Sequence, residues 1–205
     1  MEPDDNHRSW AERSGEFSPA YYAQIGSNEV SETLTNVFEY YVEEDAEILE
    51  VGCSSGRHLA HLRDDGFTNL TGIDINDESF DVMDDRYPRL AETGTFRTGA
   101  IEDVLPEYPD DAFDVVYSVE TLQHIHPENE WVFEELIRVT SDLLITAENE
   151  GNSPHRGRDG FEVSYVHDDF PLYHRDWKRV FSDLGLAQLV CEPGSRDTVR
   201  VFRAL

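Results

Sequence analysis

The sequence predicts an α/β sandwich in which helices cover a mostly parallel sheet. Two observations support this fold class. Five short segments with the length of strands alternate with segments whose apolar residues recur at helical spacing. Two further short segments then flank Pro193 and Gly194, a turn signal that predicts a terminal hairpin. Because 205 residues fit one domain with a full hydrophobic core, a single domain over residues 1–205 is expected.

The N-terminal part of the chain changes character at Pro19. Residues 1–18 are polar and charged, with Trp10 and Phe17 as isolated apolar side chains, and are expected to form a flexible arm. Apolar residues then recur at helical spacing, which predicts one or two helices within residues 19–44. The aromatic residues of these helices are explained either as core or as walls of a ligand pocket.

Residues 47–56 predict a small-ligand site. An apolar run over residues 48–51 has the composition of a buried strand, Gly52 and Gly56 bracket a turn, and residues 57–64 continue as a helix. Glycine lets the backbone approach a ligand, and free N–H groups at a helix start face the same place. A dinucleotide site favours Gly-x-Gly-x-x-Gly, whereas this turn has Gly-x-x-x-Gly after Glu50. That carboxylate favours a ligand with an ammonium or sulfonium group.

A second strand, residues 69–74, ends in Asp74. This acid follows Gly52 by 22 residues, close to the spacing of about 20 at which a strand-end carboxylate accepts ribose hydroxyls in nucleotide-binding sheets. Two adjacent hydroxyls can donate to two carboxylate oxygens. The alternative is that Asp74 only caps the helix that follows.

The remaining elements follow in order. They are a helix over 77–86, strands over 95–98 and 112–118, a helix over 131–140, a strand over 142–147, a helix over 176–184, and strands over 186–191 and 198–202. These segments complete the alternation of strands and helices.

Three of these segments resemble one known family. The residues Glu50-Val51-Gly52-Cys53-Ser54-Ser55-Gly56 resemble motif I of the class I S-adenosylmethionine-dependent methyltransferases, Glu/Asp-x-Gly-x-Gly-x-Gly, with Ser54 at the middle glycine. Residues 72–76 resemble motif II, and residues 118–125 resemble motif IV. The resemblance covers roughly residues 30–205 and implies a seven-stranded, three-layer sandwich whose last strand is antiparallel. It also implies S-adenosyl-L-methionine as cofactor.

The resemblance further implies roles for individual residues. Ile101 and Glu102 would contact adenine, although Gly-Ala-Ile replaces the common Gly-Asp-Ala and the role could fall to Asp103. Ser118 and Val119 would face the methionine half. The expected cofactor-binding residues are therefore Glu50, Gly52, Cys53, Ser54, Ser55, Gly56, Asp74, Ile75, Ile101, Glu102, Ser118 and Val119.

Glu120 and His124 are the candidate catalytic residues. They are four residues apart, which places them on one face of a helix, near the reacting end of the cofactor. A histidine there could accept a proton from a hydroxyl or amine. The alternative is a histidine that caps or packs.

Residues 148–175 are expected to form a substrate loop. They gather histidines, arginines and tyrosines in an otherwise acidic chain, and long loops are often functional. These cations suit an anionic small molecule, or they pair locally with the acids of the same segment. The two cysteines, Cys53 and Cys191, offer no zinc-ligand spacing, so no metal is expected.

The composition restricts partners and surroundings. Acidic residues outnumber basic ones 44 to 16, giving a formal net charge of −28. Nucleic acid is therefore a poor partner, and adaptation to high salt is expected, with general acidity as the alternative. No segment has the roughly 18 apolar residues that a membrane span needs, and the acidic N-terminus differs from a signal peptide, so a cytoplasmic location is expected.

The sequence thus favours a methyltransferase that acts on an oxygen or nitrogen nucleophile of a small molecule. Two alternatives stay open: an NAD-dependent oxidoreductase on a related sheet, and a non-catalytic S-adenosylmethionine-binding protein.

Overall fold

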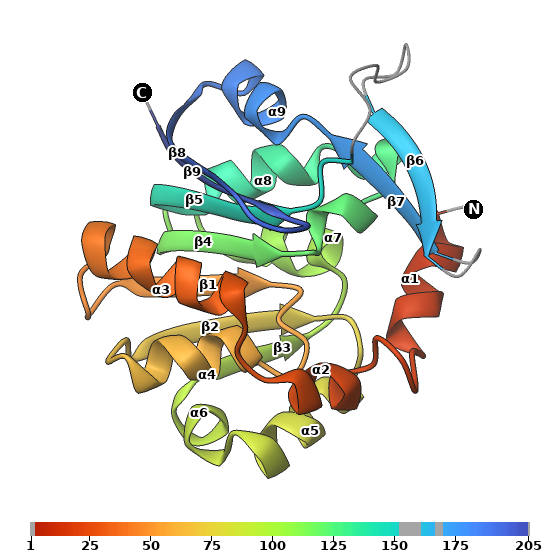
Figure 1. Cartoon of the computed structure of the whole chain (residues 1–205), viewed down its shortest axis with the longest axis vertical. Coiled ribbons are helices and arrows are strands. Elements are labelled where there is room, and N and C mark those ends of the chain that lie inside the picture. Colours follow the sequence, from red (N-terminus) through yellow and green to blue (C-terminus); the bar gives the residue numbers. More distant parts are fainter. Residues whose placement is uncertain (1–2, 152–160, 167–169, 205) are drawn as a thin grey trace.

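The computed structural model describes residues 3–151, 161–166 and 170–204. A seven-stranded sheet forms the centre of the described chain (Figure 1). Its strands are β1 (Glu47–Val51), β2 (Asn69–Asp74), β3 (Thr95–Thr98), β4 (Phe113–Val119), β5 (Thr140–Glu148), β8 (Leu186–Pro193) and β9 (Thr198–Ala204). The order is β3-β2-β1-β4-β5-β9-β8, with β9 antiparallel to both neighbours and the pairs from β3 to β5 parallel. The predicted fold class is confirmed.

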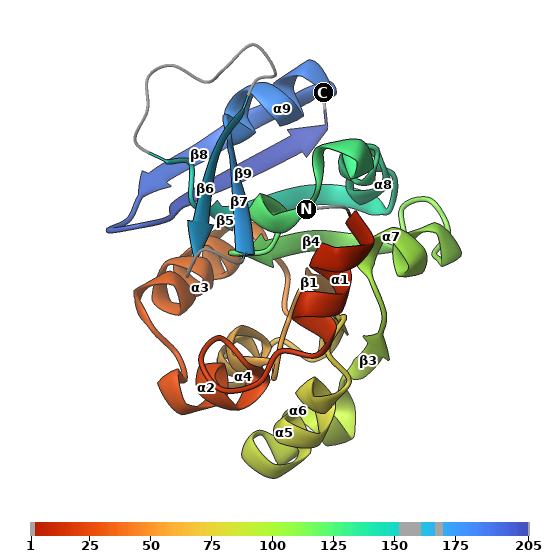
Figure 2. The same cartoon turned by 90° about the vertical axis from the view of Figure 1, so that its right-hand side faces the viewer.

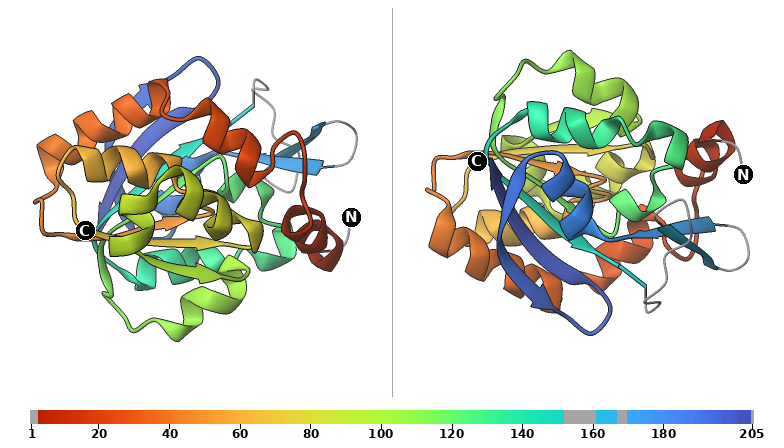
Figure 3. Two further views of the ribbon diagram at one scale, coloured as in Figure 1. Left: turned by 90° about the horizontal axis from the view of Figure 1, so that it is seen from below. Right: turned by 90° about the horizontal axis from the view of Figure 1, so that it is seen from above.

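Helices cover both faces of this sheet (Figures 1 and 3). One layer contains α3 (Glu29–Tyr41), α4 (Arg57–Asp64), α5 (Glu78–Arg86) and α6 (Pro88–Thr93). The other contains α7 (Ile101–Val104), α8 (Val132–Arg138) and α9 (Trp177–Asp183). Successive strand residues serve opposite faces, so Ile48 packs in the first layer and Leu49 in the second, both fully buried. Both layers hold the strands rigidly behind the edge where their carboxyl ends meet.

Local sequence signals set the helices that border this edge. Asn28 caps α3 by accepting from the backbone N–H of Ser31, while the Ser31 hydroxyl accepts from the backbone N–H of Asn28. The chain enters α4 through Gly56, whose φ of 78° a residue with a Cβ rarely adopts. The end of β1 and the start of α4 are thereby joined by a five-residue turn.

The structure differs from the flexible arm predicted for residues 1–18. Helices α1 (Pro3–Ala11) and α2 (Pro19–Ile25) occupy most of the segment from residue 3 to residue 25. The Asn6 side chain is buried and donates to the His124 carbonyl at 2.8 Å, and the Trp10 ring lies 4.6 Å from the His124 ring. These partners lie more than 100 residues away, so a polar sequence gives no local sign of them.

The segment expected as a substrate loop, 148–175, contains a hairpin. Strands β6 (Phe161–Val166) and β7 (Phe170–Arg175) form a separate antiparallel sheet that stands beside the main one (Figure 1). Alternating residues such as Val163 and Tyr165 lie on its exposed face, while β7 is buried throughout. The predicted loop residues 152–160 and 167–169 lie outside the described residues.

Three short 3-10 helices complete the described chain: η1 (Leu105–Glu107), η2 (Leu122–His124) and η3 (Pro127–Asn129). None of the described helices has the length and apolar character needed to cross a membrane.

Candidate active site

A pocket opens where β1, β2 and β4 end. Helix α1 lies in front of this edge of the sheet in Figure 2. It encloses about 990 Å³ of space, including its solvent-open mouth. Strand β1 lies between β2 and β4, so the direction of chain progression reverses here, and such a switch point is where open α/β sheets bind ligands. The location agrees with the site predicted from residues 47–56.

Most of the predicted site residues come together in this pocket. Those that line it are Glu50, Gly52, Cys53, Ser54, Asp74, Ile75, Ile101, Glu102, Val119, Glu120 and His124. Three do not. Ser55 and Gly56, the last two residues of the turn, do not line the pocket, and the Ser118 hydroxyl donates to Glu148 at 2.8 Å. The Ser118 side chain therefore bonds to a residue of β5 and does not line the pocket.

The turn after β1 is held in left-handed backbone conformations. Gly52 and Ser54 have φ values of 70° and 49°. A Cβ at Gly52 would collide with the Thr121 side chain, so glycine is required there. Ser54 adopts a conformation unfavourable for a residue with a Cβ, and its N–H donates to Asp74 Oδ2 at 2.7 Å. This hydrogen bond joins the β1 turn to the end of β2.

Glu50 brings a carboxyl group to the pocket floor. It is 1% exposed and accepts a hydrogen bond from the Tyr117 hydroxyl at 2.9 Å. Burial raises the pKa of Glu50 to about 8, although the Tyr117 hydroxyl and the charge of Arg57 oppose the shift. A buried carboxyl group of this kind favours a cationic group placed against it, because the cation stabilises the charged form.

Asp74 ends β2 with both carboxylate oxygens facing polar partners. Oδ2 accepts from Ser54, and Oδ1 accepts from the Asn76 N–H and the Ser79 hydroxyl, both at 2.9 Å. Burial raises the pKa of Asp74, and these hydrogen bonds oppose the shift. Oδ2 keeps a second lone pair for a ligand donor, since each carboxylate oxygen accepts about two hydrogen bonds.

Glu102, in α7, lines the pocket, whereas its alternative Asp103 does not. Its Oε1 is 3.0 Å from His7 Nε2 of α1 and accepts from Asn129 Nδ2 at 2.9 Å. Burial alone would raise the pKa of Glu102, but the hydrogen bonds from these two partners hold it below its usual value. Glu102 therefore connects α1 to the pocket wall.

Glu120 and His124 both line the pocket, but the prediction that they share a helical face is wrong. Glu120 precedes the 3-10 helix η2 with a φ of 51°, and only His124 belongs to η2. The loop turns sharply here because three of its N–H groups bind a single acceptor, Glu148. The Glu120 carboxylate lies 3.0 Å from Arg196 at the tip of the β8–β9 hairpin.

His124 is a weakly basic imidazole. Its Nδ1 lies 3.3 Å from the Pro171 carbonyl, which favours a proton on Nδ1 and a lone pair on Nε2. Burial lowers the pKa of His124 to about 4, against the effect of that carbonyl. At neutral pH the ring is uncharged and able to accept a hydrogen bond.

Glu148, at the end of β5, organises the loop after β4. The loop N–H groups of Thr121, Leu122 and Gln123 donate to its carboxylate at 3.0 to 3.2 Å, as does the Ser118 hydroxyl. Its side chain is fully buried, and burial raises the pKa of Glu148 to about 7. The sequence signal was an acid directly after the strand predicted over residues 142–147, at the start of the segment expected as a substrate loop.

The two described cations of the segment expected to serve a substrate are engaged elsewhere. Arg175 is 2% exposed, and its Nε donates to Glu130 at 2.9 Å. His174 is buried, with Nε2 2.7 Å from the Ser164 hydroxyl. Neither lines the pocket. The other expected cations, His155, Arg156, Arg158 and His167, lie outside the described residues.

Seven pocket residues come from the segment expected to be flexible and from the helix after it: Asn6, His7, Trp10, Arg13, Phe17, Pro19 and Tyr22. The sequence signal for Trp10 and Phe17 was their position as isolated aromatic residues in a polar segment.

The chain is similar to known methyltransferases in sequence. Residues 49–142 match the family described as "Methyltransferase domain". A sterol 24-C-methyltransferase of Neurospora crassa is 30% identical over 101 residues, which are 48% of this chain and 26% of that protein. The chain thus spans about a quarter of the length of this curated relative.

Solved structures with the same fold include two with related ligands. An N1-methyltransferase of Burkholderia thailandensis, with 1,6-didemethyltoxoflavin and S-adenosylhomocysteine bound, has a TM-score of 0.69 at 14% identity, over 86% of this chain and 78% of that one. Magnesium protoporphyrin IX methyltransferase of Synechocystis, with S-adenosylmethionine bound, has a TM-score of 0.65 at 13% identity, over 98% and 90%. The matched domain and this shared fold together support a methyltransferase with S-adenosylmethionine as its cofactor.

Proposed function

We propose that this chain transfers a methyl group from S-adenosylmethionine to an oxygen or nitrogen nucleophile of a small molecule. One observation carries the proposal: the buried Glu50 and the strand-end Asp74 meet at one pocket, joined by a glycine-bordered turn. The pocket offers a carboxylate for an ammonium group and a second carboxylate for sugar hydroxyls. Two of the similar proteins are named for small-molecule acceptors, which supports an acceptor of that size.

The residues present fit the cofactor. Gly52 leaves backbone space that a Cβ would fill, and Glu50 pairs with no cation within 4 Å in the described part of the chain. Glu50 would hold the ammonium group, Asp74 the ribose hydroxyls, and Ile101 with Glu102 the adenine. When bound, S-adenosylmethionine supplies an electrophilic methyl carbon, whose bond to sulfur breaks with the electron pair on sulfur as the nucleophile's lone pair attaches.

The residues around the acceptor orient it and exclude water. His124 Nε2 would accept the proton of a hydroxyl or amine nucleophile, directly or on its way to solvent. Because burial makes this imidazole a weak base, its main contribution would be to orient the nucleophile's lone pair. Glu120, held by Arg196, would complete the polar side of the acceptor space.

Two alternatives make different predictions. An NAD-dependent oxidoreductase is disfavoured because Glu50 stands beside a turn that lacks the dinucleotide glycine spacing. A non-catalytic protein would bind S-adenosylmethionine without turnover.

Calorimetry in concentrated KCl separates these alternatives. S-adenosylhomocysteine is expected to bind and NAD is not. Asp74→Asn should weaken binding at least tenfold, whereas Asp77→Asn, an exposed acid at the start of α5 whose side chain makes no capping hydrogen bond, should leave it unchanged. Equal binding to the wild type and Asp74→Asn proteins would disprove the assignment of the pocket. Formation of S-adenosylhomocysteine with candidate acceptors then distinguishes an enzyme from a binding protein.

The surroundings of the protein also belong to this proposal. We infer that the protein works in the cytoplasm and is adapted to high salt, and a formal net charge of −28 supports the salt adaptation. The same charge argues against a nucleic-acid acceptor.

A further inference from the structure

A row of aromatic and guanidinium groups runs along one wall of the pocket. Arg13, Phe17, Tyr22 and Arg57 line the pocket, and Phe170 packs against Arg13 without lining it. The Arg13 guanidinium lies over the Phe170 ring at 4.6 Å and near the Phe17 ring at 5.6 Å. The Phe17 ring is 6.5 Å from the Tyr22 ring, and the Arg57 guanidinium lies 5.2 Å from that same tyrosine ring. Four different parts of the chain therefore supply one continuous surface.

The two arginines of this wall lack an acidic partner. Within the described residues, neither Arg13 nor Arg57 has a carboxylate within 4 Å, although acids are abundant in this chain. Eight other described arginines do form such pairs: Arg8, Arg97, Arg138, Arg175, Arg179, Arg196, Arg200 and Arg203. Among the five described arginines without such a pair, Arg13 and Arg57 line the pocket, whereas Arg63, Arg86 and Arg89 do not. Two pocket arginines without an ion-pair partner favour anionic groups there, although the charge of Arg57 also acts on Glu50 and Asp197.

The two arginines are placed for different anions. Arg57 begins α4, directly after the turn that follows β1, and its charge acts on Glu50. It therefore suits the carboxylate that the cofactor carries beside its ammonium group. Arg13 lies between Phe17 and Phe170, in the segment that joins α1 to α2 and packs near β7. An anion at Arg13 would belong to a second molecule.

The Arg13 side chain is held in a fixed position. Its Nε donates to the Glu16 carbonyl at 2.7 Å, which leaves the two terminal nitrogens without a hydrogen bond in the described part of the chain. Trp10 continues the wall, with its ring 4.8 Å from Phe170 and 4.6 Å from His124. The unpaired guanidinium and the candidate base thus flank one aromatic surface.

We propose that the methyl acceptor is a flat aromatic molecule that carries a carboxylate, bound by Arg13 with its ring along Trp10 and Phe17. A planar guanidinium binds a carboxylate with two parallel hydrogen bonds, and aromatic side chains stack on a flat ring. This placement leaves a ring substituent pointing to the His124 side of the pocket. The inference rests on the proposed function, which supplies the methyl donor for that substituent.

The test uses salicylate as the aromatic carboxylate and salicylamide as its uncharged counterpart, titrated by calorimetry at one fixed KCl concentration. Salicylate should bind the protein saturated with S-adenosylhomocysteine at least tenfold more tightly than salicylamide. Arg13→Gln should remove that preference and leave the affinity for S-adenosylhomocysteine unchanged. Arg8→Gln is the matched control, because Arg8 lies on α1 with an exposed side chain and should behave as wild type.

Equal affinities for salicylate and salicylamide, no salicylate binding at millimolar concentration, or a preference that survives Arg13→Gln would each overturn the inference. Salicylate is also titrated into the protein without S-adenosylhomocysteine. If S-adenosylhomocysteine fails to bind but salicylate still binds through Arg13, the proposed function fails and the carboxylate site stands. Arg13→Lys checks the geometry, since it keeps the charge but loses the paired hydrogen bonds and should bind salicylate more weakly than wild type.

Discussion

At the scale of single residues, the pocket is defined by carboxyl groups kept away from water. Glu50 and Glu148 are both fully buried, yet they do different work. Glu148 receives four hydrogen bonds from the protein itself, whereas among the described side chains Tyr117 alone donates to Glu50. Glu50 is therefore the carboxyl group with capacity left for a ligand.

The raised pKa of Glu50 predicts that the protein releases a proton when S-adenosylhomocysteine binds. The pKa of Glu50 is raised to about 8, so the free protein holds this proton at pH 7. An ammonium group against the carboxyl stabilises its charged form, so binding of S-adenosylhomocysteine should release close to one proton at pH 7, and affinity should rise with pH toward 8. Calorimetry in buffers of different ionisation enthalpy measures the release.

Two variants check this assignment. The Glu50→Gln protein should bind S-adenosylhomocysteine without releasing a proton. Tyr117→Phe removes the hydroxyl that favours the charged carboxylate, so the release should move to higher pH. If Glu50→Gln still releases a proton as the wild type does, another group carries the linkage.

The lowered pKa of His124 predicts that the stability of the folded protein falls in acid, rather than that this residue gives the activity a pH optimum near neutrality. Its pKa is about 4 in the folded protein against about 6.5 in an unfolded chain, so the unfolded state takes up the proton first as pH falls. The stabilisation is present above pH 6.5 and is lost between pH 6.5 and pH 4, by about 3 kcal/mol. Urea unfolding across this range should show the loss, and His124→Asn should reduce it.

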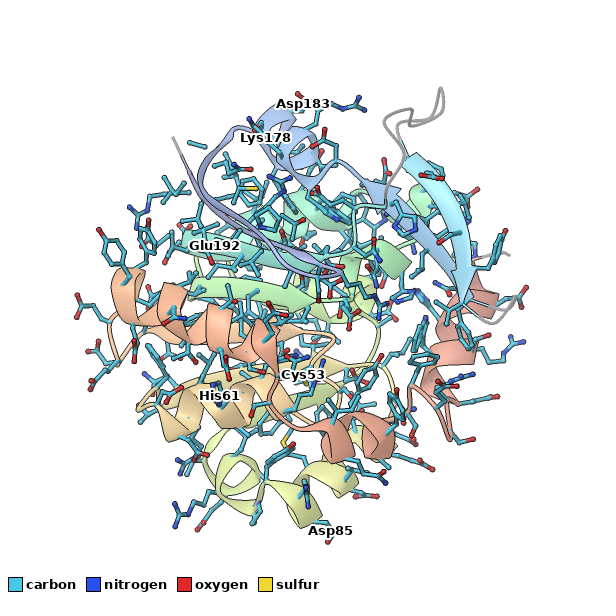
Figure 4. All side chains as sticks on the ribbon, viewed as in Figure 1. Cys53, His61, Asp85, Lys178, Asp183 and Glu192 are labelled. Carbon is cyan, nitrogen blue, oxygen red and sulfur yellow. The ribbon has the colours of Figure 1, made fainter. Side chains whose placement is uncertain are left out.

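His61→Asn, on the outer surface of α4, is the matched control for that measurement (Figure 4). In assays with an acceptor, the activity supported by His124 should vary little between pH 6 and pH 8, because the ring is already neutral there. A rate that falls tenfold as pH drops from 8 to 6, and that loses this dependence in His124→Asn, would contradict the low basicity of His124.

At the scale of elements, the loop after β4 is positioned by the strand beside it. Glu148 ends β5 and gathers the N–H groups of residues 121–123, which places Glu120 and His124 at the pocket. The register of β4 on β5, with Val119 opposite Ala147, brings the loop to this carboxylate. The catalytic candidates therefore depend on a residue that does not line the pocket.

Replacing this carboxylate should disturb both stability and the site. Glu148→Gln puts an amide N–H₂ where backbone N–H groups expect an acceptor, so we expect a loss of about 2 kcal/mol in the free energy of unfolding. Urea unfolding at pH 8 measures it, since Glu148, with a pKa of about 7, is then mostly ionised. Glu39→Gln, an exposed acid on α3, should leave stability unchanged. A Glu148→Gln protein as stable as wild type would refute the proposed anchoring.

The residue pattern within short segments predicted the strands and helices, whereas contacts between distant segments determined the features that the sequence did not predict. The strand over 69–74 matches β2, and the turn between Gly52 and Gly56 lies where the spacing indicated. Helix α1 and its part of the pocket wall were missed, because Asn6 and Trp10 find their partners at His124 and Phe170. Such contacts leave no periodic signal in the polar sequence around them.

Long-range contacts also decide what the cations of residues 148–175 do. Their cations marked the segment as unusual, but composition does not show that Arg175 is enclosed by aromatic rings and paired with Glu130. The unpaired cation of the pocket wall, Arg13, came instead from the segment with the weakest pattern.

At the scale of the whole molecule, charge repulsion dominates the surface. Exposed acids occur on helices that have no structural need for them, such as Asp84 and Asp85 at the end of α5, where Figure 4 shows Asp85 at the periphery. Lys178, on the outer side of α9, is the only lysine in the chain. Repulsion among 44 acidic side chains opposes the compact state unless salt screens it.

This repulsion predicts that salt stabilises the fold until screening is complete. The screening length shrinks from about 10 Å at 0.1 M to about 3 Å at 1 M salt, so the melting temperature should rise steeply over this range, by about 10 °C if about 3 kcal/mol of repulsion is relieved. Thermal unfolding in KCl measures the rise. The double variant Asp84→Asn, Asp85→Asn should melt higher than wild type at 0.1 M KCl and equally at 2 M, because the charges it removes matter only when unscreened. A melting temperature that is constant with KCl, or a gain in the double variant that is the same at both concentrations, would show that the acidic surface is not what makes this protein depend on salt.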